Sequence, residues 1–209
     1  MTRSSAALAA AVLLQTGAIL MACGSFGEGT PGAADGSVAA PPAAACASCD
    51  RVVFLTKGTV TGSFGGRAKA DELCNLEAST STLAQMRSKS FMAWLSDANT
   101  SATDVHVQAT GSYAIPSGGI VANGWSKLTS GSLLHAIDED VNGKQVASLR
   151  VWTGTQPGGL RSTFDCEGWT TANASVKATS GLNLDATKAW TDSIADTCDR
   201  AWPVYCFER

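Results

Sequence analysis

The chain carries little positive charge and few histidines, and its charged residues are dispersed. The net charge is −3, and lysine and arginine occur without a run anywhere in the 209 residues. Because nucleic-acid binding depends on clustered positive charge, nucleic acid is disfavoured as a partner. Only two histidines occur, His106 and His135, and no second cysteine pair has the spacing of a zinc finger. A structural zinc site is therefore not expected.

Recognisable catalytic signatures are also missing. The sequence contains neither a Gly-x-Ser-x-Gly elbow nor a His-Glu-x-x-His helix. The glycine-rich segment 62–66 lacks the Lys-Ser/Thr ending of a phosphate-binding loop and is predicted to be a turn before a helix. We therefore do not expect an enzyme, although carboxylates far apart in sequence can still meet in space.

Long apolar runs are confined to the N-terminus. Arg3 precedes a mostly apolar stretch over residues 6–20, and the small residue Ala22 stands before Cys23. This pattern predicts a secretory signal peptide over residues 1–22. The apolar stretch is too short and too alanine-rich for a transmembrane helix, which needs about 20 strongly apolar residues. No later segment approaches that length, so no span is expected.

The segment Leu20-Met21-Ala22-Cys23 resembles the lipobox of bacterial lipoproteins. The resemblance implies that Cys23 becomes the first residue and carries acyl chains, which would be the protein's contact with a membrane. Gly24, in place of an aspartate, favours the outer membrane or cell surface. The alternative is ordinary signal cleavage that leaves Cys23 as a thiol.

The remaining chain divides into a tether and one domain. Residues 23–45 are rich in Gly, Ala, Pro and Ser and are predicted to form a disordered, lipidated tether. Residues 46–209 have the length of a single domain. The chain has seven cysteines, and lipidation of Cys23 would leave an even number for disulfides in an oxidising compartment.

Apolar patterning predicts a mixed α+β domain with short antiparallel strands, one or two helices and long loops. We expect a strand over 51–56, a helix over 67–79 with Cys74 on or near its buried face, and a hairpin turn at Asn142-Gly143. Further strands are expected over 91–95, 113–115, 120–122, 133–137, 144–146, 149–153, 166–171 and 202–207.

Several segments together resemble an uncharacterised domain family of bacterial surface lipoproteins that has a C-type-lectin-like fold of the endostatin-like branch. The resemblance covers about residues 51–209. The segments are VFLT at 53–56, GSFGGRAKADELC at 62–74, FMAWLSD at 91–97, VANGWSKLTSGSL at 121–133, VWTGT at 151–155, CEGWTT at 166–171 and VYCFER at 204–209.

The resemblance implies two disulfides, Cys74–Cys206 and Cys166–Cys198. Cys46 and Cys49 remain, and we expect a small local Cys46–Cys49 bridge at the start of the domain or loose thiols there. A redox-active Cys-x-x-Cys is the alternative, but that motif normally opens a helix beside a strand, whereas this pair follows a Pro/Ala-rich tether.

Two groups of residues are candidates for ligand contacts. Trp125, Trp169 and Trp190 lie near predicted loops and could form a platform for a sugar, whereas Trp94, Trp152 and Trp202 lie in predicted strands and are assigned to the core. Asp138, Asp140 and Asn142 match the first half of a calcium-binding EF-hand loop, but Leu149 stands where that loop has its glutamate. The alternative for this segment is a charged hairpin tip.

No cofactor is expected other than calcium at that segment. The calcium-dependent sugar site of C-type lectins is not expected, because Gln156-Pro157-Gly158 lacks the closing carboxylate or amide. Binding usually resides in loops on a rigid scaffold. We therefore expect a non-catalytic recognition module that binds a glycan or a protein through loops between about 97 and 132 and between about 154 and 200. An envelope hydrolase or other enzyme on the same scaffold and a structural envelope protein are the alternatives.

Overall fold

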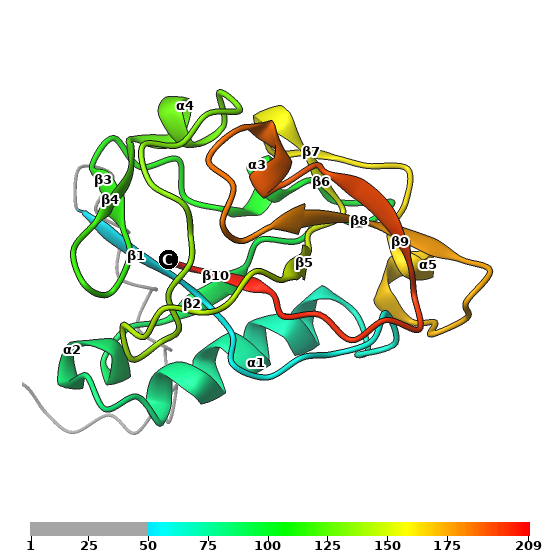
Figure 1. Cartoon of the computed structure of the whole chain (residues 1–209), viewed down its shortest axis with the longest axis horizontal. Helices are drawn as coiled ribbons and strands as arrows, with labels where there is room; N and C mark the ends of the chain where they lie inside the picture. Colours follow the sequence, from blue (N-terminus) through cyan, green and yellow to red (C-terminus); the bar gives the residue numbers. More distant parts are fainter. Residues whose placement is uncertain (1–49) are drawn as a thin grey trace, which may run out of the picture. The chain divides into compact units, whose positions relative to one another are not determined.

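The computed structural model describes residues 50–209, which form a mixed α+β domain (Figure 1). The predicted signal peptide, Cys23, the predicted tether and the Cys46–Cys49 pair lie outside the described residues. Within residues 50–209, no helix combines the length and apolar character needed to cross a membrane. The elements are β1 (Arg51–Leu55), α1 (Arg67–Ser79), α2 (Ala84–Arg87), β2 (Phe91–Ala93), α3 (Ala102–Val105), β3 (Ser112–Ala114), β4 (Ile120–Asn123), α4 (Trp125–Leu128), β5 (Arg150–Trp152), β6 (Thr155–Gln156), η1 (Pro157–Gly159), β7 (Leu160–Arg161), α5 (Cys166–Trp169), β8 (Lys177–Leu182), η2 (Lys188–Trp190), β9 (Ile194–Thr197) and β10 (Tyr205–Glu208).

A five-stranded sheet of order β2-β10-β1-β3-β4 is the centre of the domain. β10, the last strand of the chain, lies between β2 and β1 and is antiparallel to both. β1 pairs with β3 in parallel, and β3 pairs with β4 in antiparallel. The two ends of the domain therefore meet in neighbouring strands. A second sheet has the order β5-β8-β9, and β6 and β7 form a small hairpin.

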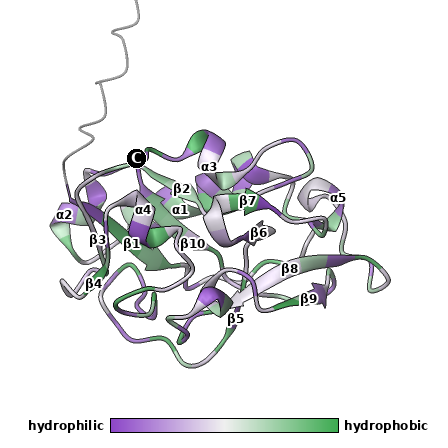
Figure 2. Cartoon of the chain, turned by 90° about the horizontal axis from the view of Figure 1, so that it is seen from above, coloured by the Kyte–Doolittle hydropathy of each residue, from purple (hydrophilic) through white to green (hydrophobic). Residues whose placement is uncertain are grey.

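Side chains alternate across the sheet and separate two cores. Val53 and Leu55 of β1 pack with Trp94 and Tyr113 in one core, whereas Phe54, between them, packs with Cys74 in the other. This alternation follows from the period of two residues in a strand. Figure 2 shows β1 and β10 coloured as hydrophobic segments inside the domain.

Two disulfides lie in the core that contains Phe54, and both have the pairing that the family resemblance implies. Cys74 of α1 is bonded to Cys206 of β10, with Cα atoms 5.6 Å apart. Cys166 is bonded to Cys198 at a Cα separation of 5.7 Å. The helix expected over 67–79 has the same bounds as α1, and Cys74 is fully buried as the periodicity predicts.

The predicted strand over 133–137 is wrong, and of the strand predicted over 144–146 only an isolated antiparallel bridge, Gln145 to Glu139, is present. Leu133 and Leu134 donate backbone hydrogen bonds to separate partners, Ala186 O at 2.7 Å and Val121 O at 2.8 Å, so they join no common ladder. The turn itself is present, because Gly143 N donates to Asp140 O at 2.9 Å and Gly143 has φ 74°.

The predicted strand over 166–171 is also wrong. α5 occupies Cys166–Trp169 there, and its four residues have positive φ. The strand β8 was missed because its sequence, KATSGL, contains Gly, Ala and Ser in place of an alternating apolar pattern.

Candidate functional site

The three tryptophans predicted to contact a ligand occupy different environments. Trp169 is 0% exposed and Trp190 is 1% exposed, so the prediction that they contact a surface ligand is wrong. Trp169 Nε1 donates to Ser96 O at 3.0 Å, and Trp190 packs on Trp94 with ring centroids 5.2 Å apart. Both are core residues, Trp190 in the cluster that contains Trp94 and Trp169 in the cluster that contains Cys74. Trp125 alone of the three is partly exposed.

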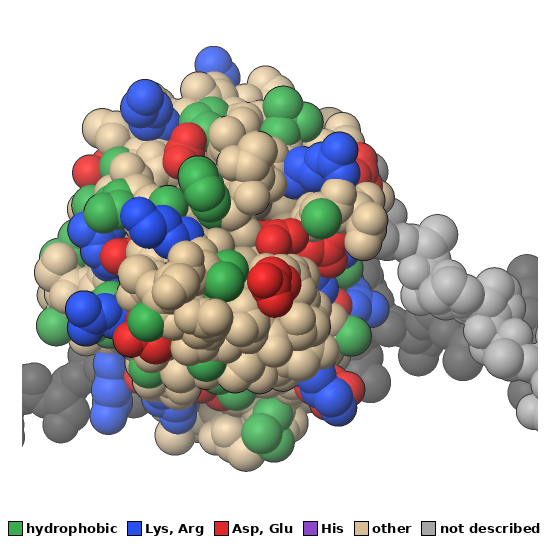
Figure 3. Space-filling view, turned by 90° about the vertical axis from the view of Figure 1, so that its right-hand side faces the viewer, with side chains coloured by type: hydrophobic (Ala, Val, Ile, Leu, Met, Phe, Trp, Pro, Cys, Tyr) green, Lys and Arg blue, Asp and Glu red, His purple; other side chains and the backbone are tan. Residues whose placement is uncertain are grey.

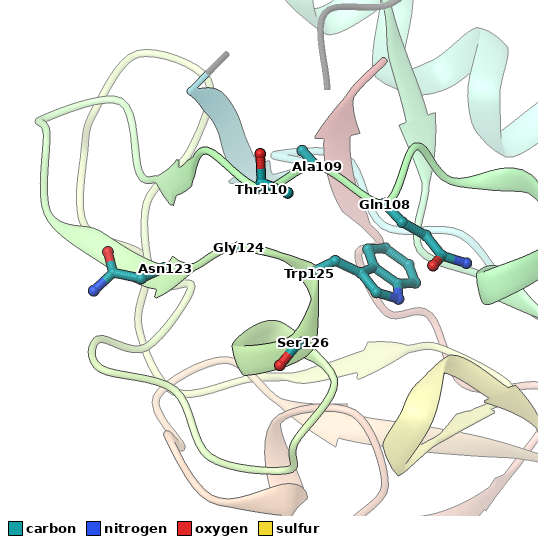
Figure 4. Close-up of a pocket in the computed structure, with 7 residues that line it drawn as sticks. All are labelled: Gln108, Ala109, Thr110, Asn123, Gly124, Trp125 and Ser126. Carbon is teal, nitrogen blue, oxygen red and sulfur yellow. The ribbon is translucent and has the colours of Figure 1, made fainter. Parts of the chain in front are cut away.

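Trp125 borders an open groove of about 360 Å³. Two segments form it: one precedes β3, and the other joins the end of β4 to α4. Trp125 N donates to Ala109 O at 2.7 Å and holds the two segments together. The groove lies within the range of about 300–1,000 Å³ that is typical of small-molecule sites. Its lining residues are Gln108, Ala109, Thr110, Asn123, Gly124, Trp125 and Ser126 (Figure 4).

Gly124 forms part of the groove floor and requires the absence of a side chain. Its φ is 84°, a left-handed conformation that favours glycine. A Cβ atom there would lie 3.2 Å from Thr110 O and 3.5 Å from Ala109 O. The close approach of the two backbones therefore depends on this residue.

Aromatic side chains hold the Trp125 indole from behind. His106 lies nearly parallel to it, with ring centroids 6.3 Å apart and an interplanar angle of 27°. Trp94 lies 5.7 Å away at 55°. Both supporting rings are buried, so Trp125 rests on the core rather than on a loop.

His106 is neutral at neutral pH. Burial lowers its pKa to about 4, and the neighbouring positive charges of Arg67 and Arg209 act in the same direction. The hydrogen bond that Nε2 donates to Ala93 O at 3.1 Å opposes this shift. Since a carbonyl can only accept, Nε2 carries the proton. The imidazole therefore supports the indole and does not face the groove as a base.

Gln108 and Asn123 place amide groups at opposite ends of the groove. Figure 4 shows the Gln108 side chain beside the Trp125 indole, whereas Asn123 points away from it. Gln108 Nε2 donates to Thr103 O at 3.3 Å. Asn123 Oδ1 accepts from Ser112 Oγ at 3.4 Å. One polar atom of each amide is therefore held by the protein.

Several side-chain oxygen atoms of the acidic turn accept hydrogen bonds within the chain, whereas Asp138 Oδ1 is buried without a hydrogen-bond partner among residues 50–209. Asp140 Oδ1 accepts hydrogen bonds from the backbone N–H groups of Asn142, at 2.8 Å, and Lys144, at 3.0 Å. Asn142 Oδ1 accepts from Thr82 N at 2.9 Å, and Asp138 Oδ2 accepts from Gln145 Nε2 at 3.0 Å. Among residues 50–209, no group of three or more His, Cys, Asp or Glu side chains is placed to hold a metal ion. The turn is thus bonded to the α1–α2 connection and to its own backbone.

A second cleft, of about 290 Å³, lies beside β7. Its charged groups are occupied locally, since Arg161 donates to Ala98 O and Asp165 accepts from Ala98 N at 2.6 Å. Figure 3 shows the face toward β8, β9 and α5, where acidic and basic side chains are interspersed. The Trp125 groove is the stronger candidate because fewer of its polar side-chain atoms form hydrogen bonds within the protein.

Sequence reasoning found Trp125 but missed its neighbours in the groove. Segments 108–110 and 123–126 are brought together by the β3–β4 pairing, in which Ser112 is opposite Asn123. The short strands expected over 113–115 and 120–122 were the available signal, because strands that pair bring their flanking residues together.

Comparison with models of known protein families finds none that matches this chain, and comparison with curated proteins finds no match either.

Proposed function

We propose that this chain is a bacterial surface lipoprotein whose C-type-lectin-like domain recognises a glycan or a protein without catalysing a reaction. In this proposal residues 1–22 are the signal peptide, Cys23 carries the lipid that anchors the protein to the outer membrane or cell surface, and residues 23–45 are the tether. Residues 46–209 carry the ligand site.

Three features support the fold assignment. The first and last strands of the domain are neighbours, and Val53 is paired with Phe207. A disulfide then joins α1, the longest helix among residues 50–209, to the last strand. The long segments between β2 and β5 contain only short elements, as the endostatin-like resemblance implies.

The partly exposed Trp125, held on a buried aromatic base, is the observation that carries the functional proposal. An aromatic side chain that is immobilised before binding loses little conformational entropy when a ligand covers it. The seven lining residues contain no carboxylate, imidazole or amine that could act as a general acid or base. These properties favour binding over catalysis.

Screening the purified full-length chain against glycan and protein arrays tests this function. We expect at least one ligand whose binding falls by about tenfold or more in a Trp125→Ala variant, because central aromatic anchors dominate interface energies. Phe164→Ala is the matched control, since Phe164 is an exposed aromatic residue, 46% accessible, that does not line the groove. Ligands bound equally by both variants, or turnover of a screened compound, would contradict the proposal.

A further inference from the structure

We infer that the Trp125 groove binds an uncharged carbohydrate chain, with one sugar ring stacked on the indole and no metal ion in the contact. The inference rests on the proposed recognition function and names its ligand class. Four properties of the groove support it: the aromatic surface, the free polar atoms, the absence of charge and the open shape.

The indole provides an apolar surface of the size of a sugar ring. His106 and Trp94 support Trp125 from the core, so its exposed area faces the groove. The C–H groups on one side of a pyranose ring form an apolar face. When this face stacks on an indole, both apolar surfaces are removed from water, which stabilises the contact. A flat indole in a fixed orientation therefore selects a flat apolar partner.

The polar atoms left free match the hydroxyl groups of a sugar. Trp125 Nε1 and Asn123 Nδ2 are donors, Gln108 Oε1 is an acceptor, and the Ser126 hydroxyl can do both. Within residues 50–209, none of these four atoms has a hydrogen-bond partner. Each sugar hydroxyl both donates and accepts, so it can pair with either kind of atom.

The absence of charged side chains in the groove lining favours an uncharged sugar over charged ligands. No lining residue is Lys, Arg, His, Asp or Glu. Phosphates and acidic sugars would lack the cationic partners that recognise them. A calcium-bridged sugar would lack the carboxylates that hold the ion.

The surroundings of the groove also disfavour a protein partner. The core of a protein interface is depleted in charge and enriched in several large apolar anchors. The exposed large hydrophobic residues of the described region lie outside the groove lining. Trp125 would be a single anchor among polar side chains, which suits a sugar chain better than a protein surface.

The open shape favours a chain over a single sugar. Figure 4 shows one amide beside the indole and the other directed away from it along the second segment. The floor between them is backbone at Ala109 and Gly124. Sugar units on both sides of the stacked ring can therefore contact the groove.

Isothermal titration of the full-length chain with a panel of oligosaccharides tests this inference. The probes are uncharged hexasaccharides of glucose, N-acetylglucosamine, xylose, mannose and galactose, with oligogalacturonate as the charged counterpart. We expect at least one uncharged probe to bind with an affinity that neither a chelator nor an increase in salt changes, because neutral contacts are not screened. Trp125→Ala should weaken binding about tenfold or more, Trp125→Phe only roughly threefold, and Phe164→Ala not at all.

Gln108→Ala provides a test that leaves the aromatic packing intact, since it removes only an exposed amide. This variant should weaken binding of the same uncharged probe by roughly threefold to tenfold. Binding of oligogalacturonate alone, or loss of binding with a chelator, would overturn the inference. If no uncharged probe binds but a protein ligand is lost in Trp125→Ala, recognition stands and the carbohydrate assignment falls. If no ligand depends on Trp125, both fall.

Discussion

At the scale of residues, the buried His106 ring stacks against the partly exposed Trp125 ring and supports it. His106 is 8% exposed and lies in the aromatic core with Trp94 and Phe207. Charging the imidazole in this position removes a cation from water, no carboxylate of residues 50–209 offsets this cost, and Arg67 and Arg209 add repulsion. The support under the candidate ligand site is therefore stable only while His106 is neutral.

We expect the free energy of unfolding to fall as the pH decreases from about 6.5 to about 4. The unfolded chain binds a proton at His106 near its ordinary pKa of 6.5, whereas the folded chain binds it only near a pKa of about 4. The unfolded state thus holds more protons in this window, and the loss approaches about 3 kcal/mol below it. Urea denaturation at a series of pH values measures the slope.

His106→Gln is the control for this pH dependence, because its amide can still donate to Ala93 O but does not titrate. Asp71, whose pKa is raised by burial, contributes a slope of opposite sign in both proteins and cancels in the difference. Identical pH slopes for the two proteins would show that His106 is not buried as a neutral ring.

At the scale of elements, α5 is a single turn of left-handed helix. Cys166, Glu167 and Trp169 have φ values of 54°, 56° and 65°, and Gly168 has 70°. Trp169 N donates to Asp165 O at 2.8 Å, and the N–H groups of Gly65 and Gly66 donate to Trp169 O at 3.0 and 3.1 Å. Left-handed residues other than glycine cost about 1–2 kcal/mol each. The disulfide and the buried Trp169 side chain offset this strain.

Glu167→Gly should therefore stabilise the protein by about 0.5–1 kcal/mol, since relief of the left-handed strain exceeds the added entropy of the unfolded chain. Glu72→Gly, at an exposed site inside the right-handed helix α1, should destabilise it by about 1 kcal/mol. The free energy of unfolding from urea titration gives both values. A loss of stability in both variants would contradict the left-handed assignment.

At the scale of the whole molecule, the disulfides act where distant parts of the chain meet. Cys74–Cys206 spans 132 residues, and Cys166–Cys198 spans 32. Each bond stabilises the fold chiefly by restricting the unfolded chain, and the effect increases with the logarithm of the loop length. The longer link fixes α1 against the central sheet, and the shorter one fixes α5 against the end of β9.

Replacing each disulfide by a pair of alanines should show that the longer loop contributes more stability. We expect Cys74→Ala with Cys206→Ala to lower the free energy of unfolding by about 5 kcal/mol, and Cys166→Ala with Cys198→Ala to lower it by about 4 kcal/mol. Urea denaturation of the oxidised proteins measures both. A larger loss from the second pair would mean that α5 packing, and not loop closure, dominates.

The sequence alone determined the mixed α+β class, the bounds of α1, the burial of Cys74 and the turn at Asn142-Gly143. These features depend on local periodicity and turn chemistry, which neighbouring residues set. The resemblance supplied the two disulfide pairings. Tertiary structure decided the rest: which tryptophan remains exposed, where β8 forms, and that residues 166–169 turn left-handed. Each of these features results from contacts between segments far apart in sequence. The burial of Trp169 and Trp190 arises only in the assembled domain, and so does the hydrogen bond between Trp125 N and Ala109 O.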